Sequence, residues 1–495
     1  MGDEKSKSAE GAAGGITAIS LRTYITAFVV LVALMVSALI VTRVLPAGEF
    51  DREIVNGSSL VVPGSYHGTA GNLPFWKWLL SPVLILAGPN NVMVIAVLIF
   101  LFAVGGAFYA LESCGVLNHL ITSISNRFRH NNRLLLFTLP FIFMLLGSLI
   151  GSFEEVIPLT AIVVALSLRL GWDRYMGLGM SLLAVGCGFA LGVINPFTIG
   201  IAQTIAGLPI FSGAWLRIIC FILVYALLMG FLTLNARRCE RSLQRERALL
   251  ERARSNGISS NAASESDVFE QSDNPLIQKA LNSFIIIFGA GIALIIACSV
   301  IPPPGLSDLV FTVTALTFLL CGIISPLRCG CGARQLISWL IKGMKAIAPG
   351  ALLVLMASSI SYMLAEAKVL DTIIYYAYGF LAGKPAWITI FGMYALILLM
   401  EFAIPSASAK AFLLIPLLAP LVDLVSIQRQ LLVLAYTFGD GFSNVFYPTN
   451  PALLIALSLG GFSYGQWFRR TWPFFLALLV FTSLVLFTGL AIGYK

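Results

Sequence analysis

Two short polar stretches interrupt long apolar sequence, and their residue types could bind opposite ends of a charged solute. The first is Gly151-Ser152-Phe153-Glu154-Glu155, and the second is Ser406-Ala407-Ser408-Ala409-Lys410. The first stretch offers two carboxylates, whereas the second offers two hydroxyls and an ammonium group. A charge at bilayer depth is costly and usually faces a water-filled cavity. The candidate substrate-binding residues in these stretches are therefore Ser152, Glu154, Glu155, Ser406, Ser408 and Lys410.

The difference in charge between the two stretches indicates the kind of solute. A dicarboxylate site would need hydroxyls, amides and cations on both sides. Acids facing a cation suit an amino acid instead, above all one with a cationic side chain, so that Glu154 and Glu155 bind positive charge and Lys410 binds a carboxylate. Two alternatives stay open. The glutamates could lie in an ordinary exterior turn between two full spans, and Lys410 could extend to the membrane surface or pair with the glutamates.

Asn-Pro dipeptides interrupt two further apolar runs, at Asn195-Pro196 and Asn450-Pro451. Proline removes a backbone donor and frees a carbonyl of the preceding turn. Hydrocarbon tolerates such a break only where the backbone is buried in protein or lines a cavity. Freed carbonyls can coordinate a cation, and the positive ends of half-helices can bind a carboxylate. A plain proline kink is the alternative, but both breaks have a threonine close by, Thr198 or Thr449, which favours a binding role.

Two further acids in apolar sequence are candidates for ion coupling. Asp440 lies between two glycines just before the second break and could bind a coupling cation. Its counterpart in the first half is Cys187, so this role would be confined to one half of the protein. Glu401 lies just over one turn before the second polar stretch and is either a proton site or a structural partner of Lys410. We expect no cofactor and no metal site, and a coupling ion that is sodium or a proton.

The sequence elements that position these residues occur twice, as an internal repeat. Three matches recur in the same order and at nearly one offset, which predicts a duplication. We expect a cytoplasmic tail over 1–23, a first inverted repeat over 24–236, a cytoplasmic linker over 237–276, and a second repeat with a connecting helix over 277–495. Hairpin tips are expected at 151–155 and 405–411, and helix breaks at 195–200 and 448–451. The matches pair Gly105–Leu111 with Ser358–Leu364, Gly186–Phe189 with Gly439–Phe442, and Phe211–Arg217 with Phe462–Arg469.

Composition places the chain in the membrane. Of 495 residues, 58% are hydrophobic and 11% charged, which is far too apolar for a soluble domain of this size. The net charge of +8 comes from basic residues between hydrophobic runs, where they orient helices, and does not indicate nucleic acid. Cys329 and Cys331 lack the further ligands that a metal site needs. None of the three histidines lies deep in an apolar run, which argues against a proton relay through histidine and against a serine protease in the membrane.

The distribution of lysine and arginine predicts the topology. Basic residues before the first span and acids after it place the N-terminus in the cytoplasm. Counting onward gives about nine crossing helices, two re-entrant hairpins that do not cross and two broken helices, with the C-terminus periplasmic or extracellular. Equivalent segments then enter from opposite sides, as an inverted repeat requires. The predicted fold class is an all-α polytopic protein of a bacterial-type inner membrane.

The tips GSFEE and PSASAKA and the breaks GVINPFTIG and GDGFSNVFYPTNPALL resemble the YfcC family of the ion transporter superfamily, related to DcuC-type four-carbon dicarboxylate carriers. The resemblance covers nearly the whole chain apart from the N-terminal tail and the connector. It implies a homodimer in which a transport domain moves like an elevator against a scaffold, and it adds Asn444 to the site. The residues that it places in the site are Glu154, Glu155, Asn195, Thr198, Ser406, Ser408, Lys410, Asn444, Thr449 and Asn450.

We therefore expect a secondary active transporter and not an enzyme. The first candidate substrate is a basic amino acid, exchanged in the manner of arginine and ornithine. The alternative is symport of a four-carbon dicarboxylate or another carboxylate with sodium or protons. A channel is disfavoured because the tips are duplicated within one chain.

Overall fold

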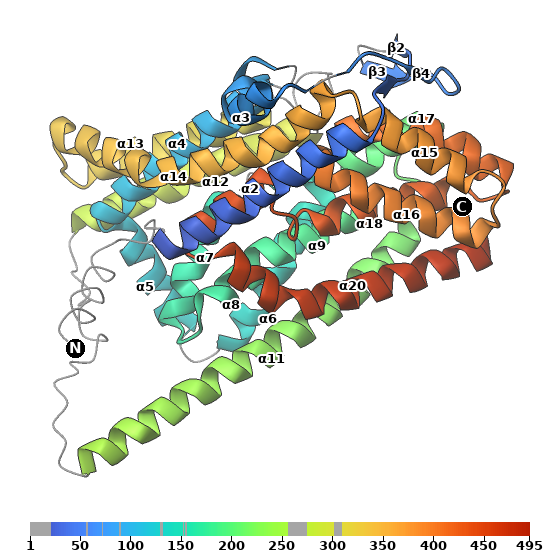
Figure 1. The fold of residues 1–495 in the computed structure, drawn as a ribbon. Helices are drawn as coiled ribbons and strands as arrows, with labels where there is room; N and C mark the ends of the chain where they lie inside the picture. Colours follow the sequence, from blue (N-terminus) through green and yellow to red (C-terminus); the bar gives the residue numbers. More distant parts are fainter. Residues whose placement is uncertain are drawn as a thin grey trace.

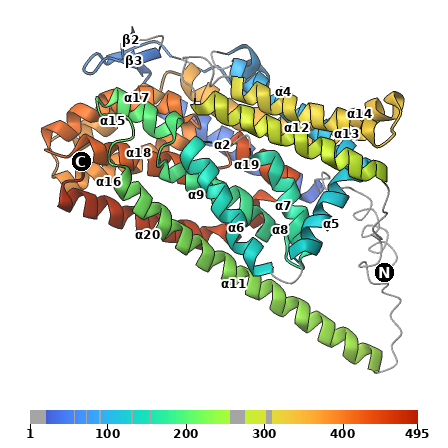
Figure 2. The same ribbon diagram turned by 180° about the vertical axis from the view of Figure 1, so that it is seen from behind.

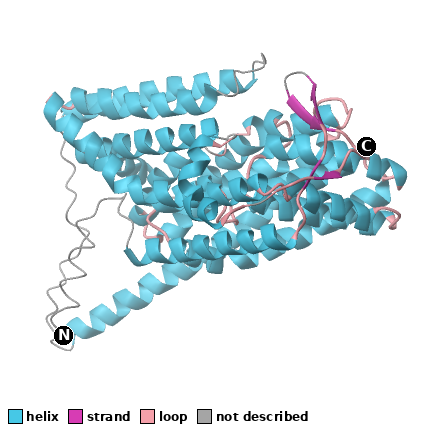
Figure 3. Ribbon diagram, turned by 45° about the horizontal axis from the view of Figure 1, so that its top comes forward, coloured by secondary structure: helices cyan, strands magenta, loops and turns pink. Residues whose placement is uncertain are grey.

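The computed structural model describes residues 21–55, 58–71, 73–88, 91–128, 132–151, 153, 156–255, 275–300 and 309–495. The described part is almost entirely helical, with two small two-stranded sheets (Figure 3). Nine of its helical segments are long and apolar enough to cross a membrane. The predicted class, an all-α polytopic membrane protein, is confirmed.

The first half begins with a long helix, which is followed by a segment with four short strands. Antiparallel pairing joins β1 to β4 and β2 to β3. Its elements are α2 (Leu21–Val44), β1 (Gly48–Glu49), β2 (Arg52–Val55), β3 (Ser58–Val61), β4 (His67–Gly68), α3 (Phe75–Leu84), η1 (Ile85–Ala87), α4 (Asn91–Ser113) and α5 (Val116–Phe128).

A helical hairpin and a broken helix complete the first half. The hairpin comprises α6 (Asn132–Leu145), η2 (Leu146–Ile150) and α7 (Ile157–Arg169). The broken helix comprises α8 (Arg174–Leu178), η3 (Gly179–Leu183), α9 (Ala184–Leu191), η4 (Pro196–Gly200) and α10 (Ile201–Ile205). The last helix, α11 (Ala214–Ser255), continues into the predicted linker over 237–276. Residues 256–274 of that linker lie outside the described residues, and 275–276 are helical.

The second half has the same order of elements after its first two helices. It contains α12 (Pro275–Val300), α13 (Leu309–Arg328), α14 (Ala333–Glu366), α15 (Leu370–Leu381), the hairpin α16 (Ala386–Ala403) and α17 (Ala407–Leu424), the broken helix α18 (Arg429–Ser443) and α19 (Pro451–Leu459), and α20 (Tyr464–Ile492). The arms α16 and α17 are each as long as a short span, so length alone does not separate a re-entrant hairpin from two crossings.

Two groups of helices lie against each other. Helices α4, α12, α13 and α14 run side by side along one face, while the hairpins and broken helices lie beside them together with α2, α11 and α20 (Figures 1 and 2). Small residues let α4 and α14 approach closely, because a Cβ added at Gly343 would lie 2.7 Å from Tyr109 Cβ and would overlap the Gly105 carbonyl. Close contact through small residues is the usual basis of helix packing in membranes.

The two broken helices cross at their glycine motifs. A Cβ added at Gly441 of α18 would overlap the backbone of Ala190 in α9, and one added at Gly186 would overlap Val445. Each hairpin also packs on the other repeat: α7 contacts α19, and α17 contacts α10. The repeats are therefore interleaved at the centre of the bundle and do not form two separate lobes.

The ends of the described chain lie far apart. Helix α2 begins at the end of the bundle where α11 extends away, whereas α20 ends at the opposite end, beside α15 and α16 (Figure 1). An odd number of crossings, as we predict, would place them in this way. Which end faces the cytoplasm stays a prediction from the basic residues.

Candidate functional site

A cavity of about 140 Å³ lies where the second hairpin, the second broken helix, α4 and α14 meet. Its wall is mainly apolar, and Ile157, the first residue of α7, brings the first hairpin to it. The polar groups are hydroxyls from Ser358, Ser361 and Ser406 and the amide of Asn450. An apolar recess with a few convergent polar groups is typical of a small-molecule site.

Asn450 starts the second half of the second broken helix. Its Oδ1 accepts a hydrogen bond from the Ala452 amide at 2.8 Å, and Pro451 occupies the first helical position. Asparagine before a helix and proline at its first residue are favoured, because the side chain satisfies an amide with no partner inside the helix and proline has no amide to satisfy. The side-chain nitrogen Nδ2 of Asn450 donates a hydrogen bond to Asn444 Oδ1 across the break. The Asn-Pro pair is thus a helix start whose N-terminal end lines the cavity.

The first break uses the same device. Asn195 Oδ1 accepts a hydrogen bond from the Thr198 amide at 3.3 Å, and Pro196 begins η4. The preceding chain turns at Gly192, whose φ of 46° lies in the left-handed region that favours glycine. Arg217 of α11 is buried and donates to the Val193 carbonyl within this break at 3.2 Å. A side chain of the protein therefore already binds one carbonyl of the first break.

The two threonines near the breaks share an unusual state. Thr198 and Thr449 are each 1% exposed. Among the described residues, neither Oγ1 has a hydrogen-bond partner. Buried hydroxyls are normally satisfied, so these two oxygens, one after the first Asn-Pro pair and one before the second, are suited to a solute, an ion or water.

Lys410 is not among the residues that line the cavity. It lies in the first turn of α17, is fully buried, and forms ion pairs with Glu401 of α16 and Asp440 of α18. The distance from Lys410 Nζ to Asp440 Oδ1 is 2.8 Å. Of the partners that the sequence left open for Lys410, the structure places Glu401 beside it and adds Asp440.

The remaining predicted site residues divide into three groups. Ser406 and Asn450 line the cavity, and Asn444 is linked to it by its hydrogen bond to Asn450. Ser408 is half-buried outside the cavity lining, and Asn195, Thr198 and Thr449 are buried at the breaks. Ser152, Glu154 and Glu155 lie outside the described residues.

Sequence reasoning missed Ser358 and Ser361 as wall residues. The available signal was the repeat match, in which Ser358-Ser359 stands where the first half has Gly105-Gly106. This signal covers Ser358 alone, because Ser361 stands opposite Phe108 in the match and the Ser359 hydroxyl donates to the Met356 carbonyl of its own helix. The ion pair of Glu401 with Lys410 was among the alternatives that the sequence left open.

Comparison with known proteins assigns the class. The family model of DcuC, the C4-dicarboxylate anaerobic carrier, matches residues 26–491. A protein of Escherichia coli K12 with the provisional name basic amino acid antiporter YfcC is 27% identical over 413 residues, covering 81% of this chain and 78% of that protein. An uncharacterized protein of Haemophilus influenzae is 23% identical over 408 residues, covering 80% and 76%.

Two solved structures are similar over 94% of this chain. The Alcanivorax borkumensis YdaH transporter has a TM-score of 0.45 at 18% identity and is covered over 99% of its length. Neisseria gonorrhoeae MtrF, described as one of a class of antimetabolite efflux pumps, has a TM-score of 0.39 at 17% identity and is covered over 94%. The family match spans nearly every helix described above, including both hairpins and both breaks. This chain is a membrane transporter that belongs to the DcuC family.

Proposed function

We propose that this protein is a secondary active transporter of a small carboxylate-bearing solute, and that a basic amino acid is its first substrate. The observation that carries the proposal is the capped start of α19 at the cavity. Partial positive charge at a helix N-terminus attracts carboxylates, and α19 is nine residues long. Ser406, Ser358 and the Asn450 amide supply hydroxyl and amide groups around the same place.

The opposite end of the solute would meet the first tip. Glu154 and Glu155 precede Ile157 by three and two residues, and Ile157 is part of the cavity wall. Two carboxylates so close in sequence to the wall suit a cationic side chain, as in arginine or ornithine. The name of the Escherichia coli relative points in the same direction. In this proposal a helix end, and not Lys410, binds the solute carboxylate.

A four-carbon dicarboxylate is the second candidate, because the matching family model carries that description. The two candidates differ in what they require of the first tip. A dicarboxylate gains nothing from Glu154 and Glu155, whereas a basic amino acid depends on them.

We further propose an elevator mechanism in a homodimer of the inner membrane. The cavity wall is divided between α4 and α14 on one side and the second tip, α19 and α7 on the other. Sliding of the hairpins and broken helices along the layer of α4, α12, α13 and α14 would carry the solute from one side of the membrane to the other. Exposed apolar side chains on α12 and α13, such as Ile286 and Leu316, suit lipid or a second copy of the chain.

Solute binding tests the proposal directly. Purified protein would be titrated by calorimetry with arginine, ornithine, citrulline and succinate, after a thermal-shift survey of amino acids and dicarboxylates, since a ligand stabilises the folded state that binds it. We expect binding of arginine and ornithine and weaker binding of neutral citrulline. Binding of succinate without arginine would establish the second candidate, and failure of all carboxylate-bearing solutes would refute both.

A further inference from the structure

Three charged side chains meet inside the bundle behind the second tip. Lys410 of α17 is paired with Glu401 near the end of α16 and with Asp440 near the end of α18. The three side chains are at most 1% exposed. Since they come from three different helices, this charged cluster joins the second hairpin to the half of the broken helix that ends at the second break.

The charged cluster has one more acid than base. Lys410 Nζ is paired with Glu401 Oε2 and Asp440 Oδ1, and all four carboxylate oxygens are buried and accept no hydrogen bond from the described residues. An uncompensated charge in such a place is very costly. One proton on the carboxylate pair removes the excess and gives one of these oxygens a hydrogen to donate.

The described part of the surrounding elements supplies no second cation. Among the described residues, Lys410 is the single base paired with Glu401 and Asp440. Tyr436, one turn before Asp440 on α18, donates its hydroxyl to the Ala407 carbonyl. The buried Arg217 lies toward the start of α18, away from Asp440. Arg217 donates a hydrogen bond to the Tyr494 hydroxyl, which donates to the carbonyl of Gly213, and Gly213 lies against Gln430. Gln430 precedes Asp440 by ten residues, about 15 Å along the helix.

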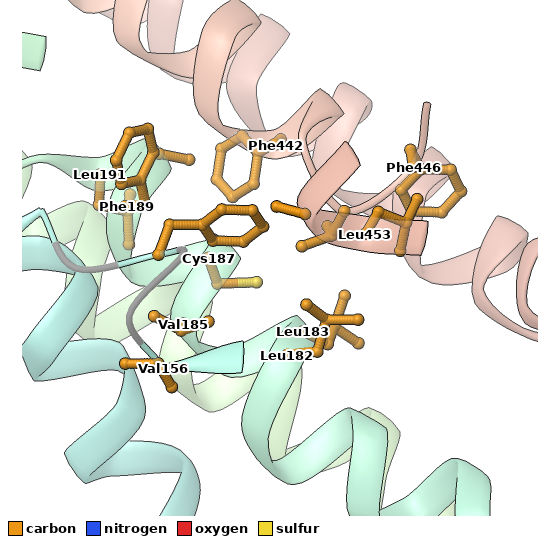
Figure 4. Close-up of a cluster of buried hydrophobic side chains, with 14 of the residues drawn as sticks. Val156, Leu182, Leu183, Val185, Cys187, Phe189, Leu191, Phe442, Phe446 and Leu453 are labelled. Carbon is orange, nitrogen blue, oxygen red and sulfur yellow. The ribbon is translucent and has the colours of Figure 1, made fainter. Parts of the chain in front are cut away.

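At the equivalent place in the first repeat, the residues that the structure describes are apolar. Cys187, the counterpart of Asp440, is fully buried, and the side chains labelled around it in Figure 4 are apolar. The labelled side chains of this apolar cluster are Val156, Leu182, Leu183, Val185, Phe189, Leu191, Phe442, Phe446 and Leu453. The two repeats have therefore diverged here, and in the described chain this type of charged cluster occurs at the second break alone.

A coupling cation such as sodium is usually held by unwound carbonyls and helix ends at helix breaks. In this protein Arg217 already donates to the Val193 carbonyl at the first break, and Lys410 already lies between the two carboxylates before the second. Arg217 therefore binds a carbonyl of the first break, and Lys410 binds the acids next to the second.

We propose that Lys410 is a tethered cation that replaces sodium, and that Glu401 and Asp440 together carry one exchangeable proton, which makes this pair the proton-coupling site. One carboxyl O–H bond breaks to give a carboxylate and a proton that passes to water, and the reverse step reforms it. Lys410 keeps its charge in both states. The coupling role rests on the proposed transport function, whereas the bound proton and the absence of sodium do not.

The bound proton can be observed without substrate. Infrared spectra of the purified wild-type protein would be recorded at neutral pH in H₂O and in D₂O and compared with those of Glu401→Gln and Asp440→Asn. The control is Glu366→Gln, which alters the carboxylate that pairs with Lys77 at the end of α14. We expect the wild type and the control to show the C=O stretch of one protonated carboxyl. Either cluster variant should lose this band, because the charge of the one remaining carboxylate is then balanced by the Lys410 ammonium group and no proton is needed. The same band in all four proteins, or in none, overturns the proposal.

Sodium provides a second test. The unfolding temperature of the wild type should be equal in sodium and potassium salts. Lys410→Met should become selectively stabilised by sodium, since two carboxylates are left without their cation, while the control Lys384→Met, at an exposed loop, should not change. If Lys410→Met does not fold, Lys410→Met combined with Glu401→Gln takes its place. Selective stabilisation of the wild type by sodium contradicts the proposal.

Coupling itself is read from proton exchange during solute binding. Calorimetry in two buffers of different ionisation enthalpy should give about one proton exchanged per solute for the wild type and none for Glu401→Gln. An unchanged proton count in Glu401→Gln overturns the coupling role. If no carboxylate-bearing solute binds the wild type, the transport proposal fails, and the infrared and sodium measurements still decide whether the proton and the tethered cation are there.

Discussion

Replacement of Asn450 should separate the helix-capping role of this residue from its role in solute binding. Its Oδ1 accepts from the Ala452 amide at 2.8 Å, its amide donates to Asn444, and it lines the cavity. Asn450→Ala removes the cap, which costs about 1 kcal/mol, and leaves the buried Asn444 Oδ1 without a donor, which costs about 1–3 kcal/mol. We expect the free energy of unfolding to fall by about 2–4 kcal/mol and the solute affinity to fall as well.

Asn450→Ser is the matched variant, because serine caps a helix about as well as asparagine but has no amide. It should recover the capping contribution of about 1 kcal/mol while solute affinity stays reduced. Asn282→Ala, on the exposed face of α12, is the control for purification and assay. Thermal unfolding in detergent measures stability, and calorimetry with the best-bound solute measures affinity. Equal losses of stability in Asn450→Ala and Asn450→Ser would refute the capping argument, and wild-type affinity in both would remove Asn450 from the site.

Three further predictions concern packing, topology and specificity. Gly441→Ala should destabilise the protein by about 1–3 kcal/mol or more, since its Cβ would overlap the backbone of the other broken helix, whereas Gly230→Ala meets open space and should not lower the unfolding temperature. A reporter fused to the C-terminus should read periplasmic and one inserted near Ser260 cytoplasmic; two cytoplasmic readings would refute the inverted repeat. Glu154→Gln and Glu155→Gln should each weaken arginine binding at least tenfold and leave citrulline nearly unchanged, measured by calorimetry. Equal losses of affinity for arginine and citrulline would mean that the glutamates do not recognise the cationic group.

The amino-acid sequence by itself determined the features that depend on neighbouring residues. Runs of apolar residues specify the helices and their place in a membrane. Each Asn-Pro pair specifies the start of a half-helix, because the cap, the proline and the amides that they serve lie within four residues of one another. The repeat was also visible, since Gly186–Phe189 and Gly439–Phe442 keep the same two glycines, and one glycine of each motif lies at the crossing of the broken helices.

The tertiary structure alone decided which distant side chains meet. From the sequence, Lys410 could equally extend to the surface, pair with Glu154 or Glu155, or pair with Glu401. Its position among α16, α17 and α18 selects Glu401 and Asp440 and leaves it outside the cavity lining. Ser358 likewise became a cavity residue only because α14 packs against α19. Partners of this kind depend on the angle and depth at which separate helices cross, and that geometry is set by the packing of the whole bundle, not by residues near in sequence.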